Sequence, residues 1–131
     1  MSQTKKTILI VEDELDLCQI LKKKFEYEGF NIIEAHNGEI GLNIALKEHP
    51  DLILLDIIMP IMDGMTMLKK LREDKWGGHV PVIILTNLNE TKKVSEGIEN
   101  DVYSYLVKSN WELDDIVSLV RKNLGLNDSN L

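Results

Sequence analysis

Acidic, hydroxyl and basic side chains follow four short apolar runs of this 131-residue chain. Glu12 and Asp13 follow the first of these runs, Asp56 the second, Thr86 the third and Lys108 the last. Carboxylates that share a small space repel one another, and a hard divalent cation such as Mg²⁺ relieves the repulsion. Asp56 could then attack a phosphoryl group in line, with the hydroxyl and the ammonium contacting the phosphoryl oxygens. These residue types predict a magnesium-dependent phosphoryl-transfer site, provided that the fold brings them together.

The elements that would position these side chains are short strands that alternate with amphipathic helices. Apolar runs predict strands at 8–11, 30–35, 52–55, 82–85 and 103–107. Apolar residues at helical spacing predict a first helix that contains 17–25 and is ended by Gly29, and further helices at 40–47, 65–72, 90–100 and 111–124. Strands that are apolar at every position are typical of parallel sheets, which are buried on both faces. We therefore predict a doubly wound α/β sheet, with the candidate residues at the edge where its strands end.

The first predicted helix carries an apolar face and the chain's single cysteine. The residues at helical spacing, and therefore expected to be buried, are Leu17, Ile20, Leu21 and Phe25. Cys18 is expected to be a small, partly buried packing residue, and no internal disulfide can form.

Each candidate residue also has an interpretation without chemistry, and these interpretations stay open at this point. Asp13 could cap the first helix. Thr86 could form a turn or a cap, and Lys108 could be a solvated surface lysine. The histidines have no metal-ligand spacing, so we expect structural or surface roles for His36, His49 and His79.

The composition excludes several classes of function. The formal net charge of −7 argues against direct binding of nucleic acid or of an anionic membrane surface, because both require a basic face. The sequence shows no signal peptide and no apolar stretch of the length that spans a bilayer, so a cytoplasmic protein is expected. The length predicts one domain over 1–131, with a core at about 6–124 and a tail at 125–131.

One motif makes the sequence resemble a known family. Residues Asp56 to Gly64 read D-x-x-M-P-x-x-D-G, and the segments 8–14, 81–86 and 105–108 add further matches. Over about residues 6–124 the chain resembles the receiver domains of two-component response regulators, including stand-alone chemotaxis receivers. The spacing agrees with that family, since Thr86 lies 30 positions and Lys108 52 positions after Asp56.

The resemblance implies a fold and a metal site. The implied fold is the flavodoxin-like (βα)5 receiver fold, a five-stranded parallel sheet in the order 2-1-3-4-5. Asp56 would be the phosphoacceptor, assisted by Thr86 and Lys108. The implied ligands of Mg²⁺ are Glu12, Asp13, Asp56 and the backbone carbonyl of Ile58.

The resemblance also implies a switch and partners. Phosphorylation would draw the Thr86 hydroxyl inward, and the Tyr105 ring would follow. The phosphodonor would be a sensor histidine kinase or a histidine phosphotransfer protein. A downstream protein would bind the face formed by the fourth helix, fifth strand and fifth helix. The chain would catalyse only its own phosphorylation and dephosphorylation and would not be an enzyme in the wider sense.

Two positions depart from the family pattern. Ser109 follows Lys108, where proline is usual, and this predicts a trans bond because a cis bond before a non-proline residue costs about 2.5–4 kcal/mol. Asn87 stands where a small residue is common and could restrict Tyr105. Few residues follow the last predicted helix, so the chain is expected to act through protein contacts or to be a piece of a longer regulator.

Three other functions compete with that of a receiver. A binding module that has lost phosphorylation is disfavoured because the full acidic, hydroxyl and basic set is present. A second aspartate two positions after Asp56 would favour a phosphatase with an aspartyl nucleophile, but Ile58 stands there. A flavin or nucleotide binder would need a glycine-rich loop where Glu12, Asp13 and Glu14 stand.

Overall fold

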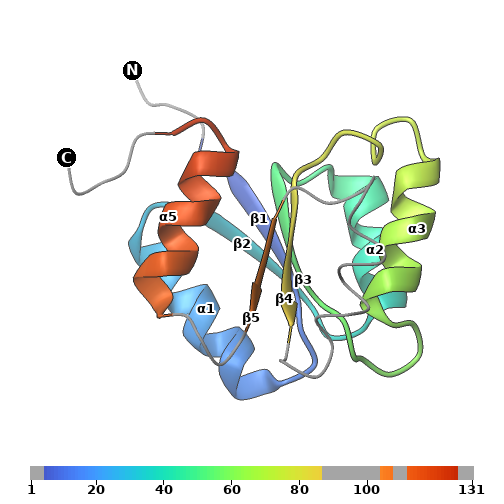
Figure 1. Cartoon of the computed structure of the whole chain (residues 1–131), viewed down its shortest axis with the longest axis horizontal. Coiled ribbons are helices and arrows are strands. Elements are labelled where there is room, and N and C mark those ends of the chain that lie inside the picture. Colours follow the sequence, from blue (N-terminus) through green and yellow to red (C-terminus); the bar gives the residue numbers. More distant parts are fainter. Residues whose placement is uncertain (1–4, 87–103, 108–111, 127–131) are drawn as a thin grey trace.

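A single parallel sheet forms the centre of the molecule (Figure 1). The computed structural model describes residues 5–86, 104–107 and 112–126, and side chains within 5–85 and 112–126. The strands are β1 (Thr7–Val11), β2 (Asn31–Ala35), β3 (Leu52–Asp56), β4 (Val82–Thr86) and β5 (Ser104–Val107). They are hydrogen-bonded in the order β2-β1-β3-β4-β5, and all pairs are parallel. The predicted doubly wound sheet and its order are confirmed.

Helices cover both faces of this sheet. The described helices are α1 (Leu15–Tyr27), α2 (Gly38–Glu48), α3 (Gly64–Glu73) and α5 (Leu113–Asn123). In Figure 1, α1 and α5 lie on one side of the sheet and α2 and α3 on the other. These bounds lie within two residues of the predictions. The helix predicted at 90–100 lies outside the described residues.

The register of the strands determines which residues share an edge of the sheet. Val11 of β1 is paired with Leu55 of β3, so Glu12, the next residue, is level with Asp56. Asp56 is in turn paired with Leu85 of β4. Because parallel strands all run in one direction, their carboxyl ends meet at one edge, which is where open α/β sheets bind their ligands.

Alternating strand residues supply two hydrophobic clusters, one on each face. Leu9 and Val11 belong to the cluster beneath α2 and α3. Ile8 and Ile10 belong to the cluster beneath α1 and α5. Side chains of the central strands are fully buried on both faces, which explains why these strands are apolar at every position.

The buried face of α1 differs from its prediction. Cys18, Leu21 and Phe25 are buried, and Leu17 packs at the margin of the cluster. The prediction is wrong for Ile20, whose residue surface is 49% exposed. An α-helix turns about 100° per residue, so Ile20 points about 200° away from Cys18.

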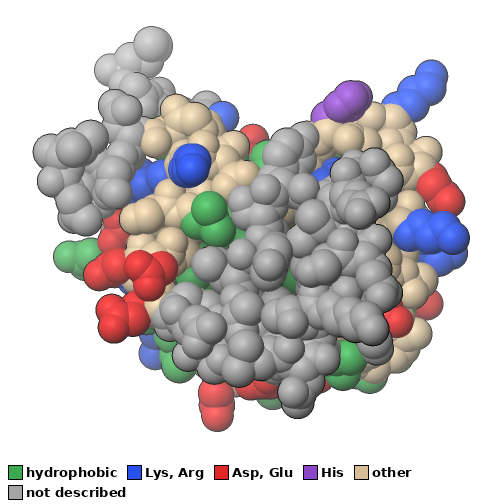
Figure 2. Space-filling view, viewed as in Figure 1, with side chains coloured by type: hydrophobic (Ala, Val, Ile, Leu, Met, Phe, Trp, Pro, Cys, Tyr) green, Lys and Arg blue, Asp and Glu red, His purple; other side chains and the backbone are tan. Residues whose placement is uncertain are grey.

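Ion pairs join α1 to α5 at the surface. Lys24 Nζ lies 2.8 Å from Asp114 Oδ1, and Arg121 Nη2 lies 3.3 Å from Glu28 Oε1. Acidic side chains gather over this side of the molecule in the space-filling view (Figure 2). Within the described ranges, every helix falls short of the length and apolar character needed to cross a membrane.

Cys18 is more deeply buried than predicted and faces a carboxylate. Its surface is 0% exposed, and Sγ lies 3.3 Å from Glu34 Oε1. Burial, followed by the hydrogen bond to Glu34, raises the pKa of the Cys18 thiol to about 12. Near pH 8 the nucleophilic thiolate is therefore almost absent in the folded chain.

We expect Cys18 of the folded protein to resist a disulfide reagent such as dithionitrobenzoate near pH 8, because the thiol is both buried and protonated. The reagent's absorbance change, followed with and without denaturant, measures the reaction. Labelling should follow global unfolding. Rapid labelling of fully folded protein would show that this side of the core opens locally, contrary to the expectation.

Candidate functional site

Three carboxylates meet at the carboxyl edge of the sheet. One oxygen from each of Glu12, Asp13 and Asp56 lies within 4.8 Å of the others. Glu12 is 0% and Asp56 3% exposed, whereas Asp13 is exposed to solvent. The proximity expected from the sequence is found. Two members of the cluster are buried, and the third, Asp13, is accessible to water.

Glu12 is held by backbone and side-chain hydrogen bonds. Its N–H donates to the carbonyl of Ala35 at 3.0 Å, which extends the β1–β2 ladder by one residue. Its carbonyl lies 3.0 Å from Nδ1 of His36, and its Oε2 accepts from the N–H of Glu14 at 3.1 Å. From the sequence, His36 is expected to be only a structural or surface residue. Its place directly after a strand is the signal that could have found this contact.

Asp56 is the last residue of β3, and its surroundings are equally fixed. Its Oδ1 accepts from the N–H of Ile57 at 2.8 Å, which limits rotation of the carboxylate. The N–H of Gly64 donates to the carbonyl of Ile57 at 2.7 Å, which draws the start of α3 against the strand end. A Cβ at Gly64 would overlap the Asp56 carbonyl oxygen, so glycine is required there.

The loop between β3 and α3 is held by two hydrogen bonds at the end that leads into α3. Asp63 caps α3, because its Oδ1 accepts from the N–H of Thr66 at 2.7 Å. The N–H of Gly38, the first residue of α2, donates to the carbonyl of Met62 at 2.9 Å. Ile61 has a φ of 70°, which is uncommon for a β-branched residue. The D-x-x-M-P-x-x-D-G motif therefore forms the loop that follows Asp56 and leads into α3.

The structure decides between the two interpretations of Asp13. The N-cap residue of α1 is Glu14, and its side chain makes no cap hydrogen bond. Asp13 lies one residue before that position and belongs to the carboxylate cluster. The interpretation of Asp13 as a cap is therefore wrong.

The remaining predicted site residues are described only in part. Thr86 ends β4 and its backbone is paired with Val107, while Tyr105 is paired with Ile84. Thr86 and Tyr105 thus lie on adjacent strands. Lys108, its bond to Ser109 and Asn87 lie outside the described residues.

The donor set of the cluster suits a hard divalent cation. Carboxylate oxygens are ligands that Mg²⁺ prefers, and it commonly uses one or two carboxylates together with water. Buried carboxylates at this separation repel one another unless a positive charge compensates them. The solvent-exposed Asp13 leaves a side of the cluster open to water. The residues present therefore fit Mg²⁺.

Comparisons with known proteins agree with this geometry. The family described as the response regulator receiver domain matches residues 8–121. "Histidine kinase P4" of Formosa agariphila is 39% identical over 79% of this chain and 8% of its own length. "Probable transcriptional regulator ycf27" of Porphyridium aerugineum is 34% identical over 96% of this chain and 52% of its own length. The chain therefore spans about half the length of the second relative and far less of the first.

A solved structure shows the same fold. The receiver domain of the Francisella response regulator 1452 superposes with a TM-score of 0.83 at 30% sequence identity. The superposition covers 92% of this chain and 98% of that one. The similarity therefore extends over nearly the entire domain.

We predict that Gly64→Ala destabilises the fold by about 1–3 kcal/mol, because the added methyl group would overlap the backbone of Asp56. Urea unfolding measures the loss. Gly78→Ala is the matched control, since a Cβ there would have its nearest neighbour at 3.5 Å, an ordinary contact. Equal stability of the two variants would contradict the close approach between α3 and β3.

Proposed function

Because this chain belongs to the family of response regulator receiver domains, we propose that it is a phosphorylation switch with Asp56 as phosphoacceptor and Mg²⁺ bound beside it. The observation that carries the proposal is the cluster of Glu12, Asp13 and Asp56 at the carboxyl edge of the sheet. The family match alone would not identify the residues that form the site. The cluster supplies both a nucleophile and the negative charge that holds a cation.

The protein groups that would hold Mg²⁺ are the three carboxylates and, by the resemblance, the backbone carbonyl of Ile58. When bound, Mg²⁺ would neutralise the cluster and the charge of an incoming phosphoryl group. Glu12 is positioned for this role by its hydrogen bonds to Ala35 and Glu14. The exposed Asp13 would complete the site from the solvent side.

The proposed transfer moves a phosphoryl group from a histidine of the partner to Asp56. A carboxylate oxygen of Asp56 attacks the phosphorus of a phosphohistidine, a P–O bond forms and the P–N bond breaks. The electron pair returns to the donor imidazole, which takes a proton from water. The product is an acyl phosphate on Asp56. The Ile57 N–H, 2.8 Å from Oδ1, keeps the carboxylate oriented during attack.

The switch is proposed to pass from Asp56 to the neighbouring strands. Thr86 would hydrogen-bond a phosphoryl oxygen and Lys108 would contribute a positive charge. Tyr105 would follow the movement of Thr86 and alter the face formed by the fourth helix, β5 and α5. The adjacency of the Thr86 and Tyr105 strands supports this path. A downstream protein would distinguish the two states of that face.

The phosphodonor is proposed to be a sensor histidine kinase or a histidine phosphotransfer protein. A histidine kinase contains a region similar to this chain, which supports a partner of that class. We further propose a cytoplasmic location and no direct contact with nucleic acid or membrane, in keeping with the net charge of −7. The chain would act on itself and not on a separate substrate, since Ile58 offers no general acid near Asp56.

We expect incubation with acetyl phosphate and Mg²⁺ to add the mass of one phosphoryl group, because Asp56 is then an oriented nucleophile beside a neutralising cation. Intact-mass spectrometry measures the addition. Asp56→Asn and a sample with chelator should both remain unmodified. A folded wild-type protein that gains no mass and binds no Mg²⁺ would instead be a phosphorylation-independent interaction module.

We also expect Mg²⁺ to raise the thermal midpoint of the wild-type protein, because it binds only the folded state. Asp13→Asn should reduce this gain while leaving the metal-free protein at least as stable, since one of three clustered negative charges is removed. Differential scanning calorimetry at matched ionic strength measures both effects.

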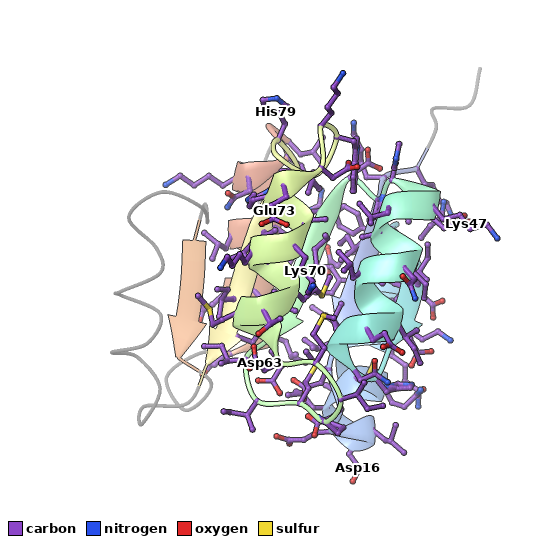
Figure 3. All side chains as sticks on the ribbon, turned by 90° about the vertical axis from the view of Figure 1, so that its right-hand side faces the viewer. Asp16, Lys47, Asp63, Lys70, Glu73 and His79 are labelled. Carbon is purple, nitrogen blue, oxygen red and sulfur yellow. The ribbon has the colours of Figure 1, made fainter. Side chains whose placement is uncertain are left out.

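Glu73→Gln is the control for this second experiment. Glu73 is an exposed acid at the end of α3, and Figure 3 places it away from Asp16 and Asp63, which lie at the site end of the sheet. The rise in the thermal midpoint of Glu73→Gln on addition of Mg²⁺ should equal that of the wild type. Equal gains in Asp13→Asn and wild type would refute a role for Asp13 in holding the metal.

A further inference from the structure

We propose that His36 is a positioning residue of the metal site, acting through the peptide bond that joins Glu12 to Asp13. This inference rests on the proposed function and names a residue outside the carboxylate cluster. His36 follows β2 directly and lies beside the end of β1, which is the neighbouring strand.

The contact between His36 and Glu12 has a defined direction. Nδ1 of His36 lies 3.0 Å from the carbonyl oxygen of Glu12. A carbonyl oxygen can only accept, so Nδ1 carries the proton and donates. The same Glu12 residue donates its own N–H to Ala35 at 3.0 Å. Two consecutive residues of the β2 end therefore hold the backbone of Glu12 on both sides.

The held carbonyl belongs to the peptide unit that leads into Asp13. A peptide unit is planar, so fixing its oxygen also fixes the nitrogen and Cα of the next residue. Asp13 lies beyond β1, before α1 begins, and is exposed, so core packing does not orient it. His36 thus acts on the cluster member that has the fewest constraints from the fold.

Glu34 lies on the other side of the imidazole ring. Nε2 of His36 faces Glu34 Oε1 at 4.0 Å. Glu34 in turn accepts from Cys18 Sγ at 3.3 Å and Gln19 Nε2 at 3.2 Å, and Lys22 Nζ lies 3.3 Å from its Oε2. Burial raises the pKa of Glu34, but hydrogen bonds from Cys18 and Lys22 lower it overall, so the group stays a carboxylate.

A line of contacts therefore runs from α1 through Glu34 and His36 to the Glu12–Asp13 peptide. Groups that orient metal ligands affect metal affinity without touching the metal. The side chain of His36 is 45% exposed, which moderates the strength of its hydrogen bond. We expect its loss to weaken Mg²⁺ binding by about three- to tenfold.

The test compares His36→Ala with His36→Asn by titration calorimetry of the full chain with MgCl₂. The asparagine amide can place an N–H where Nδ1 stands, whereas alanine removes the donor. His79→Ala is the control, because Figure 3 shows His79 at the opposite end of the molecule from Asp16 and Asp63. Urea unfolding without Mg²⁺ reports any general loss of stability.

The expected result is weaker Mg²⁺ binding in His36→Ala, with His36→Asn and His79→Ala within about twofold of the wild type. Unchanged affinity in His36→Ala would overturn the inference. Equal weakening in both His36 variants would also overturn it, since the donor would then be irrelevant. A wild-type protein that binds no Mg²⁺ would instead remove the proposed function, and this inference with it.

Discussion

Three carboxylates that repel one another lie together at the carboxyl edge of the sheet, and the surrounding fold must hold them there. Glu12 and Asp56 are almost completely buried, with Asp13 beside them. Like charges so placed favour the unfolded chain unless they are hydrogen-bonded or compensated by a cation. The fold keeps them together through the register of β1 and β3, which sets Glu12 level with Asp56. A parallel sheet buried on both faces provides the rigidity that this arrangement requires.

The backbone around the cluster is adapted to the same constraint. Gly64 permits α3 to approach the end of β3, and Gly38 anchors the intervening loop to α2. On the other side, His36 and Ala35 hold the backbone of Glu12. These contacts join the residues around the cluster to α3, to α2 and to the end of β2. Asp56 therefore sits on a rigid support, and the proposed switch residues Thr86 and Tyr105 belong to the adjacent strands β4 and β5.

Local errors in the sequence analysis have physical causes. Ile20 lies three positions after Leu17 and so fits a helical repeat with it, but the face that packs is defined by Cys18, Leu21 and Phe25. When a helix carries more apolar residues than its buried face can hold, the sequence pattern does not show which of them is exposed to solvent. Asp13 satisfies the residue preference for a cap, yet α1 begins after Glu14. Cap preference depends on where the helix starts, and helix ends are the least certain feature of a sequence pattern.

The parallel sheet, and the edge where Glu12 and Asp56 lie, could be predicted from the sequence, because continuous apolar runs indicate buried parallel strands and such strands end at one edge. The sequence also determined the family, through the spacing that follows Asp56. Only the tertiary structure decided that Asp13 joins the carboxylate cluster and that His36 contacts Glu12. The first depends on how β1 pairs with β3, and the second on how β1 pairs with β2. Contacts between residues about 24 positions apart follow from strand register and side-chain rotamers, which no local pattern encodes.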